Sequence, residues 1–220
     1  ALRSGCVGAV HGSRHGSLGL GRCGGWVGDV LGGWPGGVLA VARPLAGSES
    51  GAGGGSQADL TTFAARGIDG VSVVTAVTEQ NTLGVRAVQE IEPALVTAQL
   101  DAVAEDFSIS ALKTGMLASA PVIEQVVAGI RRHRLQHLVV DPVMVAKSGD
   151  RLLREDAVNA LRTLLLPLAE LVTPNLPEAE VLAGQAIHSM ADRVTPARAP
   201  RFLAPQAAVI KCGLSDPHPA

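Results

Sequence analysis

The stretch GSESGAGGGSQADL, residues 47–60, places five glycines directly ahead of residues 57–60, which are typical of the first turn of a helix. Glycine is favoured where the backbone turns sharply or approaches a ligand closely. A helix N-terminus adds free N–H groups and a partial positive charge, so the loop could cradle a phosphate or a small polar ligand beside the Asp59 carboxylate. The alternative is a flexible linker, which the glycines alone favour.

The composition excludes several classes of protein. The chain has 220 residues, 47% of them hydrophobic and 17% charged, which suits one core or at most two small domains. A net charge of -2, 2% aromatic residues and no tyrosine argue against nucleic-acid binding. No apolar run predicts a membrane span and no secretory signal is evident. Three cysteines without a CxxC pair favour a reducing compartment, so we expect a cytoplasmic protein.

Residues 1–37 differ from the rest of the chain. They contain 13 of the 26 glycines and show neither helical nor strand periodicity. We expect a glycine-rich segment that is poorly ordered or was read from a shifted frame, followed by one domain over residues 38–220.

From residue 38 onward, strand and helix patterns alternate. Predicted strands lie within 38–47, where Arg43-Pro44 interrupts the pattern, and at 71–77, 110–116, 137–144, 171–175 and 207–213. Predicted helices cover 56–65, 93–106, 121–133, 154–166 and 177–184. This alternation predicts an α/β fold with a parallel sheet covered on both faces.

Ligands of such sheets bind beyond the carboxyl ends of the strands, and polar residues gather there in this sequence. They are Glu79, Gln80, Asn81, Lys113, Thr114, Asp141, Asn175, Glu178 and Lys211. Acidic and amide groups beside lysines and glycine-rich turns are suited to phosphate and Mg²⁺. Each residue alone is weak evidence, because an aspartate at a strand end is more often a turn former.

Five motifs occur in order: GSESGAGGGSQADLTTF, VTEQNTLGV, KTGML, DPVMVAKSGD and VTPNLPEAEVL. Together they resemble the hydroxymethylpyrimidine and phosphomethylpyrimidine kinases of thiamine biosynthesis, in the ribokinase-like superfamily, from about residue 46 to about residue 214. The resemblance implies a three-layer α/β/α sandwich with a mainly parallel central sheet. It also implies ATP-dependent phosphorylation of 4-amino-5-hydroxymethyl-2-methylpyrimidine and then of its monophosphate, with Mg²⁺. Family members are often homodimers.

The resemblance also implies a pyrimidine site. Asp59 would hydrogen-bond the aminopyrimidine and Gly47 would form the floor of the pocket. Gln80 would contact the ring from a neighbouring strand end, and Met116 would wall it. With the motif order known, a ligand-binding loop replaces the linker as our interpretation of residues 47–60.

On the nucleotide side, the resemblance implies that Asp141 organises Mg²⁺ or phosphate. Asn175 and Glu178 match an N-x-x-E motif that positions Mg²⁺, so Asp141 and Glu178 are the expected metal-side carboxylates. Lys211 matches the lysine of a K-G-G motif beside the nucleotide.

The sequence departs from the family pattern in places. Glu49 stands where the family has aspartate, and Cys212 interrupts K-G-G. The family's glycine-rich anion hole and catalytic base lie in a segment beyond Ala220, so we expect a C-terminally truncated domain with no catalytic residue of its own and impaired activity. The alternatives are a pyridoxal-type vitamin B6 kinase and a catalytically dead pyrimidine-binding fragment.

Overall fold

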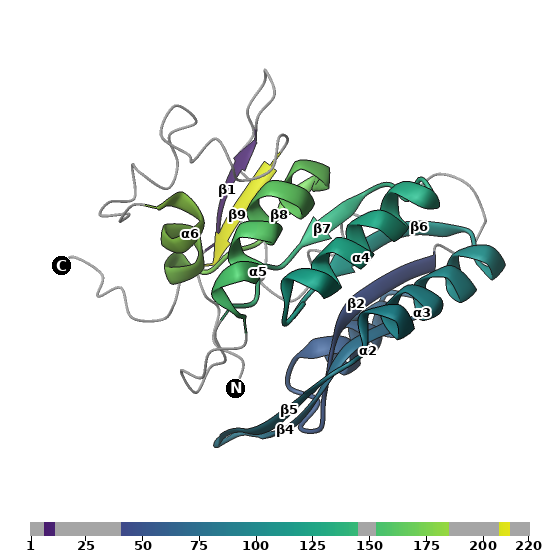
Figure 1. Ribbon diagram of the computed structural model, residues 1–220, viewed down its shortest axis with the longest axis horizontal. Coiled ribbons are helices and arrows are strands. Elements are labelled where there is room, and N and C mark those ends of the chain that lie inside the picture. Colours follow the sequence, from purple (N-terminus) through teal and green to yellow (C-terminus); the bar gives the residue numbers. More distant parts are fainter. Residues whose placement is uncertain (1–6, 12–40, 145–152, 185–206, 212–220) are drawn as a thin grey trace.

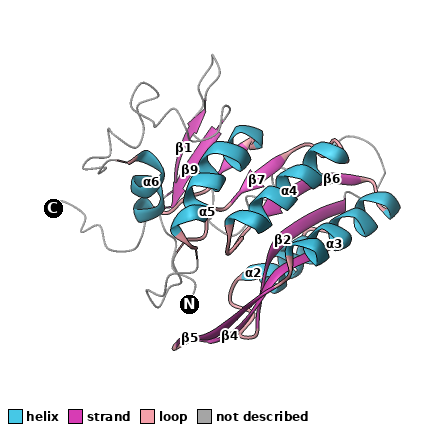
Figure 2. Cartoon of the chain, viewed as in Figure 1, coloured by secondary structure: helices cyan, strands magenta, loops and turns pink. Residues whose placement is uncertain are grey.

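A computed structural model describes residues 7–11, 41–144, 153–184 and 207–211, and within them the chain folds around one sheet (Figures 1 and 2). The strands are β1 (Val7–His11), β2 (Val41–Glu49), β3 (Asp69–Gly70), β4 (Val73–Asn81), β5 (Gly84–Glu90), β6 (Ile109–Thr114), β7 (Leu138–Val140), β8 (Leu171–Val172) and β9 (Ala207–Lys211). Their order is β1-β9-β8-β7-β6-β2-β4-β5, with β3 paired to β2. All pairs are parallel except β1 with β9 and β4 with β5. This confirms the mainly parallel α/β sheet.

The helices are α2 (Gly55–Ala65), α3 (Pro93–Asp106), α4 (Ala120–Arg132), α5 (Glu155–Ala160) and α6 (Leu176–Ala183). The predicted helix at 93–106 is confirmed, and those at 56–65, 121–133 and 177–184 are confirmed to within a residue. The predicted helix at 154–166 is divided, because α5 continues as a π-helical turn (Leu161–Leu165) and a 3-10 turn (Leu166–Leu168). Pro167 lacks an N–H group, which prevents a regular α-helical end there.

Strand β2 lies inside the sheet, between β6 and β4, and runs without a break through Arg43 and Pro44, so the predicted interruption is wrong. The register explains how a central strand accommodates proline. Pairs between β2 and β3 end at Ala42, and pairs between β2 and β4 begin at Leu45. Pro44 therefore falls in the gap between these two ladders, where its missing N–H group removes no pair on this side of β2. On the other side of β2, Pro44 is paired with Lys113 of β6.

One face of the sheet is covered by α3, α4 and α5 (Figure 1). Helix α4 buries Val122, Ile123, Val126, Val127 and Ile130, which recur at helical spacing along one side. They pack with Leu45, Leu112 and Val140 of the sheet in the main core. Helices α3 and α4 approach closely because position 129 is glycine: a Cβ there would lie 2.0 Å from Leu100 Cδ2.

The opposite face of β2 carries helix α2. Phe63 of α2 and Ile68 pack against Ala42 and Ala111 of the sheet in a second, smaller core. Since side chains alternate between the faces of a strand, Ala42 faces α2 while Leu45 faces the main core. These two layers of helices and the sheet form the expected three-layer sandwich, and they fix the start of α2 over the carboxyl end of β2.

Three strands were not predicted from the sequence, among them the two-residue strand β3. Strand β5 forms a hairpin with β4, and β1 pairs antiparallel with β9 although residues 1–37 show no strand periodicity. The rest of that glycine-rich segment lies outside the described residues. No helix in the described part of the chain is long and apolar enough to cross a membrane.

Candidate functional site

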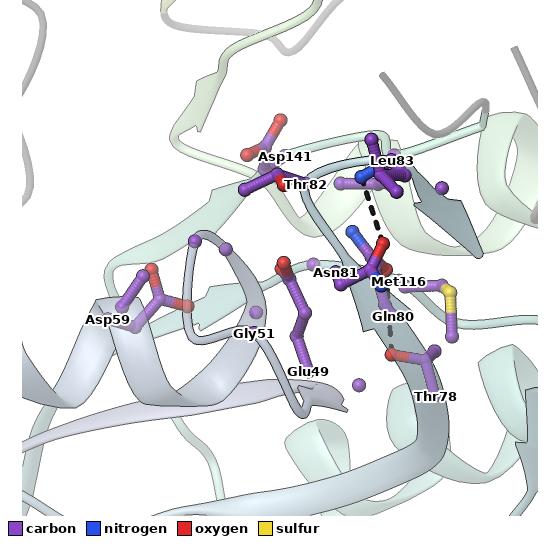
Figure 3. A pocket seen from close by; sticks show the side chains of 18 of the residues that line it. Glu49, Gly51, Asp59, Thr78, Gln80, Asn81, Thr82, Leu83, Met116 and Asp141 are labelled. Atoms are coloured by element: carbon purple, nitrogen blue, oxygen red, sulfur yellow. Dashed lines mark hydrogen bonds between the residues drawn. The ribbon is translucent and has the colours of Figure 1, made fainter. Parts of the chain in front are cut away.

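A cavity of about 770 Å³ opens at the carboxyl ends of β2, β4, β6 and β7 (Figure 3). The glycine-rich loop and the first turns of α2 form one wall, and the tip of the β4–β5 hairpin forms another. Lining residues with polar or large side chains are Glu49, Asp59, Thr78, Gln80, Asn81, Thr82, Leu83, Lys113, Met116 and Asp141. Of the residues predicted for the site, Gly47, Asp59, Gln80, Met116 and Asp141 line this cavity.

Hydrogen bonds hold the glycine-rich loop in place. Ser50 Oγ donates to the Gln80 carbonyl oxygen at 2.7 Å and accepts from the Gln80 N–H at 2.9 Å. Gln57 spans the loop, because its Oε1 accepts from the Glu49 N–H at 2.9 Å and its Nε2 donates to Ser48 Oγ at 2.6 Å. The loop is thus tied both to β4 and to α2, which contradicts the flexible-linker alternative.

The turn into α2 requires glycine. Gly55 has φ +62°, and a Cβ at this position would lie 2.4 Å from the Gly47 carbonyl oxygen. The Ser56 hydroxyl donates to the Ala46 carbonyl oxygen at 3.1 Å, so it binds the chain leaving β2 to the start of α2. This close approach of backbone to backbone places Asp59 at the cavity wall.

Lys113 connects the two carboxylates of the cavity floor. Its Nζ lies 2.8 Å from Asp59 Oδ2 and 3.9 Å from Asp141 Oδ2. Asp141 Oδ1 in turn accepts from Lys211 Nζ at 2.7 Å. The four groups therefore alternate in sign, from α2 through β6 and the end of β7 to β9. The side chains of Asp59, Lys113 and Asp141 are 15%, 12% and 19% exposed, so solvent screens these charges only in part.

Burial has the largest effect on the pKa of Asp59. Desolvation raises the pKa of its carboxyl group above the ordinary value, and the Asp141 charge adds to this rise. The Lys113 ammonium group opposes both effects through its charge and its hydrogen bond. Lys113 is therefore the group that favours the ionised, hydrogen-bond-accepting form of Asp59.

Apolar and amide groups complete the wall opposite Asp59 (Figure 3). A Cβ on residue 47 would lie 3.0 Å from Met116 Cε, so Gly47 leaves just enough room for this methionine. Met116 is fixed by Thr75, whose hydroxyl donates to the Met116 carbonyl oxygen at 2.6 Å. Thr78 Oγ1 donates to the Ser48 carbonyl oxygen at 3.2 Å and lies 3.5 Å from Gln80 Oε1, at the limit of a hydrogen bond.

Asn175 and Glu178 lie behind the cavity and do not line it. Asn175 caps α6 by accepting from the Glu178 N–H at 2.8 Å, while Glu178 Oε2 accepts from the Asn175 N–H at 2.8 Å. Glu178 Oε1 also accepts from the Met144 N–H at 3.3 Å. Burial raises the pKa of Glu178. The hydrogen bond from the Asn175 N–H and the Lys211 charge oppose this rise, because they stabilise the ionised carboxylate. This N-x-x-E motif is a capping box in structural terms.

The donor set suits a metal ion shared with a ligand. Among the described residues, no group of three or more histidine, cysteine, aspartate or glutamate side chains could hold a metal by itself. Asp141 lines the cavity and has one oxygen, Oδ2, outside hydrogen-bond distance of Lys113. One carboxylate completed by waters and phosphate oxygens is a common Mg²⁺ arrangement. Glu178, with both oxygens occupied by N–H groups, fits a water-mediated position.

Two features of the site were not assigned from the sequence. Lys113 was noted at a strand end but given no role, because its partners Asp59 and Asp141 are distant in sequence. The hairpin residues Thr82 and Leu83 lie on the wall opposite α2 because β5 turns back along β4. The carboxylate of Glu49, which stands where the family has aspartate, lies among the loop glycines: a Cβ on Gly54 would be 2.7 Å from its Oε2.

Comparison with known proteins adds independent findings. The family model for phosphomethylpyrimidine kinase matches residues 49–219. A hydroxymethylpyrimidine/phosphomethylpyrimidine kinase from Rhizobium meliloti is 53% identical over 150 residues, which cover 68% of this chain and 56% of that protein. The chain thus spans a little over half of this relative's length.

Solved structures are similar as well. The crystal structure of the phosphomethylpyrimidine kinase from Clostridium difficile shares 44% identity and a TM-score of 0.66, covering 70% of this chain and 67% of that one. An ADP complex of Bacillus subtilis pyridoxal kinase shares 34% identity and a TM-score of 0.71, covering 80% and 67%. Both likenesses confirm the ribokinase-like fold expected from the sequence.

Proposed function

Because this chain belongs to the phosphomethylpyrimidine kinase family, we propose that it serves the ATP-dependent phosphorylation of 4-amino-5-hydroxymethyl-2-methylpyrimidine and of its monophosphate in thiamine biosynthesis. The observation that carries the proposal is the Asp59–Lys113 pair at the wall of a 770 Å³ cavity, at the carboxyl end of a parallel sheet. The homodimer and the cytoplasmic location expected from the sequence stay predictions.

In this proposal, the cavity binds the pyrimidine ring. The Asp59 carboxylate, hydrogen-bonded by Lys113, accepts a hydrogen bond from the 4-amino group. The Gln80 amide supplies a second polar contact, and the Met116 side chain covers the ring where Gly47 leaves room for it. A carboxylate accepting from an amine is a strong, directional contact, so it fixes the orientation of the ring.

The ATP side of the site contains Asp141 and Lys211 in this proposal. Asp141 faces the cavity, and Lys211 stands beside it on β9. We propose that Lys211 contacts the nucleotide phosphates, while Asp141 directly and Glu178 through water hold Mg²⁺. A bound Mg²⁺ ion would neutralise phosphate charge and orient the transferred group.

The residues of this chain contribute position and charge to the reaction. Asp59 holds the ring so that its 5-hydroxymethyl oxygen, the attacking atom, faces Asp141 and the nucleotide side. Fixing two reactants at contact distance in this way lowers the entropic part of the barrier. The loop of residues 47–55 and the β4–β5 hairpin form opposite walls of the cavity, which limits the access of water to the acceptor.

A pyridoxal-type kinase is the second candidate. The structural likeness to the Bacillus subtilis pyridoxal kinase favours it, since the TM-score of 0.71 exceeds that for the Clostridium difficile enzyme. The sequence favours the pyrimidine instead, with 53% identity to the Rhizobium meliloti enzyme against 34% to the pyridoxal kinase.

Calorimetric titration of the purified chain separates these candidates. We expect binding of the hydroxymethylpyrimidine that is at least tenfold tighter than binding of pyridoxal under the same conditions. Tighter binding of pyridoxal would assign the second candidate, and binding of neither would contradict the proposal. A following ATP-dependent phosphorylation assay distinguishes an active enzyme from a chain that only binds pyrimidine.

A further inference from the structure

The cavity has a charge imbalance. The carboxylates of Glu49, Asp59 and Asp141 line it, and Lys113 is the one lysine or arginine among its described lining residues. A phosphate monoester carries about two negative charges at neutral pH. The second proposed acceptor therefore brings a phosphate group into a cavity whose lining is net negative. Lys211 offsets Asp141, to which it is hydrogen-bonded at 2.7 Å, but it does not line the cavity, so Lys113 is the lining cation that can meet the phosphate.

Lys113 has the capacity to do so. Of the three N–H groups of an ammonium, one is used in the 2.8 Å hydrogen bond to Asp59 Oδ2. The 3.9 Å separation from Asp141 Oδ2 is an ion pair without a hydrogen bond. Within the described part of the chain, the remaining donors of Lys113 are therefore free to meet a ligand in the cavity, where the side chain is 12% exposed.

The chemistry of the acceptor places its phosphate near these donors. In 4-amino-5-hydroxymethyl-2-methylpyrimidine, the amino group and the hydroxymethyl group are on adjacent ring atoms. A ring whose amino group bonds Asp59 carries its 5-substituent beside that contact. Lys113 is the lining cation beside that contact, because its Nζ lies 2.8 Å from Asp59 Oδ2 and 3.9 Å from Asp141 Oδ2.

Resting on the proposed function, we propose that Lys113 is the residue that recognises the phosphate of the monophosphate acceptor, donating to a phosphate oxygen while Asp59 holds the ring. The contact with Lys113 thereby adds to the affinity of the site for the monophosphate and does not add to its affinity for the free alcohol. A purely positioning role, in which Lys113 only keeps Asp59 ionised, makes a different prediction. It would affect both acceptors equally, because both present the same amino group to Asp59.

The test compares the two acceptors by calorimetry in EDTA, so that no metal ion supplies the positive charge. We expect Lys113→Gln to weaken binding of the monophosphate tenfold to about a hundredfold, the range for losing a hydrogen bond to a charged group. Binding of the free alcohol should change less than threefold, since glutamine still donates to Asp59. Lys113→Arg, which keeps the charge, should retain most of the affinity for the monophosphate.

Arg86→Gln is the matched control. It removes one positive charge from the β4–β5 hairpin outside the cavity, where the Arg86 side chain is 66% exposed and pairs with Glu79 at 3.5 Å. It should leave both affinities unchanged.

Each remaining outcome overturns the assignment. Equal losses for the two acceptors in Lys113→Gln would reduce Lys113 to a positioning residue, and an unchanged affinity for the monophosphate would exclude the phosphate contact. If wild-type protein binds neither acceptor, the proposed function fails and the assignment with it. If Lys113→Gln does not fold, the double variant Asp59→Asn/Lys113→Gln is compared with Asp59→Asn. In both of these variants residue 59 has no carboxylate that could be left buried and unpaired. The proposal again requires that the double variant lose affinity for the monophosphate and keep its affinity for the free alcohol.

Discussion

Lys113 Nζ lies 2.8 Å from Asp59 Oδ2, although the two residues are 54 positions apart in sequence. Lys113 belongs to β6, which pairs with β2, and Asp59 belongs to α2, which packs on the face of the sheet that includes Ala42 of β2. The pair therefore depends on the order of the sheet, and it joins the glycine-rich loop to the strand end that carries Asp141.

Asp59 should carry recognition of the pyrimidine. Replacing it by alanine removes a largely buried acceptor of a charge-assisted hydrogen bond, so Asp59→Ala should weaken binding of the hydroxymethylpyrimidine by about 2 kcal/mol or more. Calorimetry measures the change. Asp69→Ala, on the exposed strand β3, should have no effect. Unchanged binding in Asp59→Ala would show that the ring is held elsewhere.

The protonation of Asp59 should appear in the pH dependence of stability. Burial raises its pKa in the folded chain, so the folded state binds the proton more tightly than the unfolded state. The free energy of unfolding contributed by this group is then complete below the unfolded pKa and is lost as the pH rises through the folded pKa.

Asp59→Asn cannot ionise and should escape this loss. The difference in free energy of unfolding, variant minus wild type, should therefore increase as the pH rises above about 4, the ordinary pKa of an aspartate. Urea denaturation at several pH values measures it. A difference that stays flat, or that decreases with pH, would mean that the Lys113 charge outweighs desolvation at this site.

Replacing Gly55 by alanine should lower the stability of the fold more than replacing Gly67, which has a similar backbone conformation. Gly55 and Gly67 have φ +62° and +69°, so each alanine costs about 1 kcal/mol in a left-handed conformation. A Cβ at Gly55 would in addition lie 2.4 Å from the Gly47 carbonyl oxygen, whereas at Gly67 nothing lies within 4 Å. Gly55→Ala should therefore destabilise by about 3 kcal/mol or more in denaturant titrations and should also weaken pyrimidine binding. Equal costs at the two positions would contradict the rigid turn.

Arg43 should be replaceable by an apolar residue. Its side chain is fully buried in β2, where Nη1 donates to the Leu100 carbonyl oxygen at 3.2 Å. Within the described residues, Nε and Nη2 have no hydrogen-bond partner, and burial lowers the pKa of Arg43 to about 10. Arg43→Met should therefore raise the free energy of unfolding by about 1–3 kcal/mol, the usual cost of unsatisfied buried groups.

Thermal and urea unfolding test this expectation, with Arg86→Met on the exposed hairpin as the matched control. A clear loss of stability in Arg43→Met alone would show that the guanidinium group has a structural task in the core.

Helix α3 shows how far local sequence reaches. Pro93 at its start and apolar residues at helical spacing predict its limits, Pro93–Asp106, because helix starts and periodic faces are encoded in neighbouring residues. Strand β5 shows the limit: four of its seven residues are exposed and it forms only by pairing with β4, so no buried face marks it in the sequence. Pro44 shows the same limit, since its effect on β2 depends on which neighbouring strand lies opposite.

By itself, the sequence determined the α/β class, four of the five predicted helices and the polar residues at the carboxyl ends of the strands, since motif order and periodicity are properties of the chain. The tertiary structure decided which of these residues meet. It brought Asp59, Lys113 and Asp141 together, and it placed Glu178 behind the cavity as part of a helix cap. The physical reason is that an ion pair depends on the distance between side chains across the sheet, which is set only when the strands are in order. Burial likewise exists only in the folded chain, where it raises the pKa of Asp59 and of Glu178.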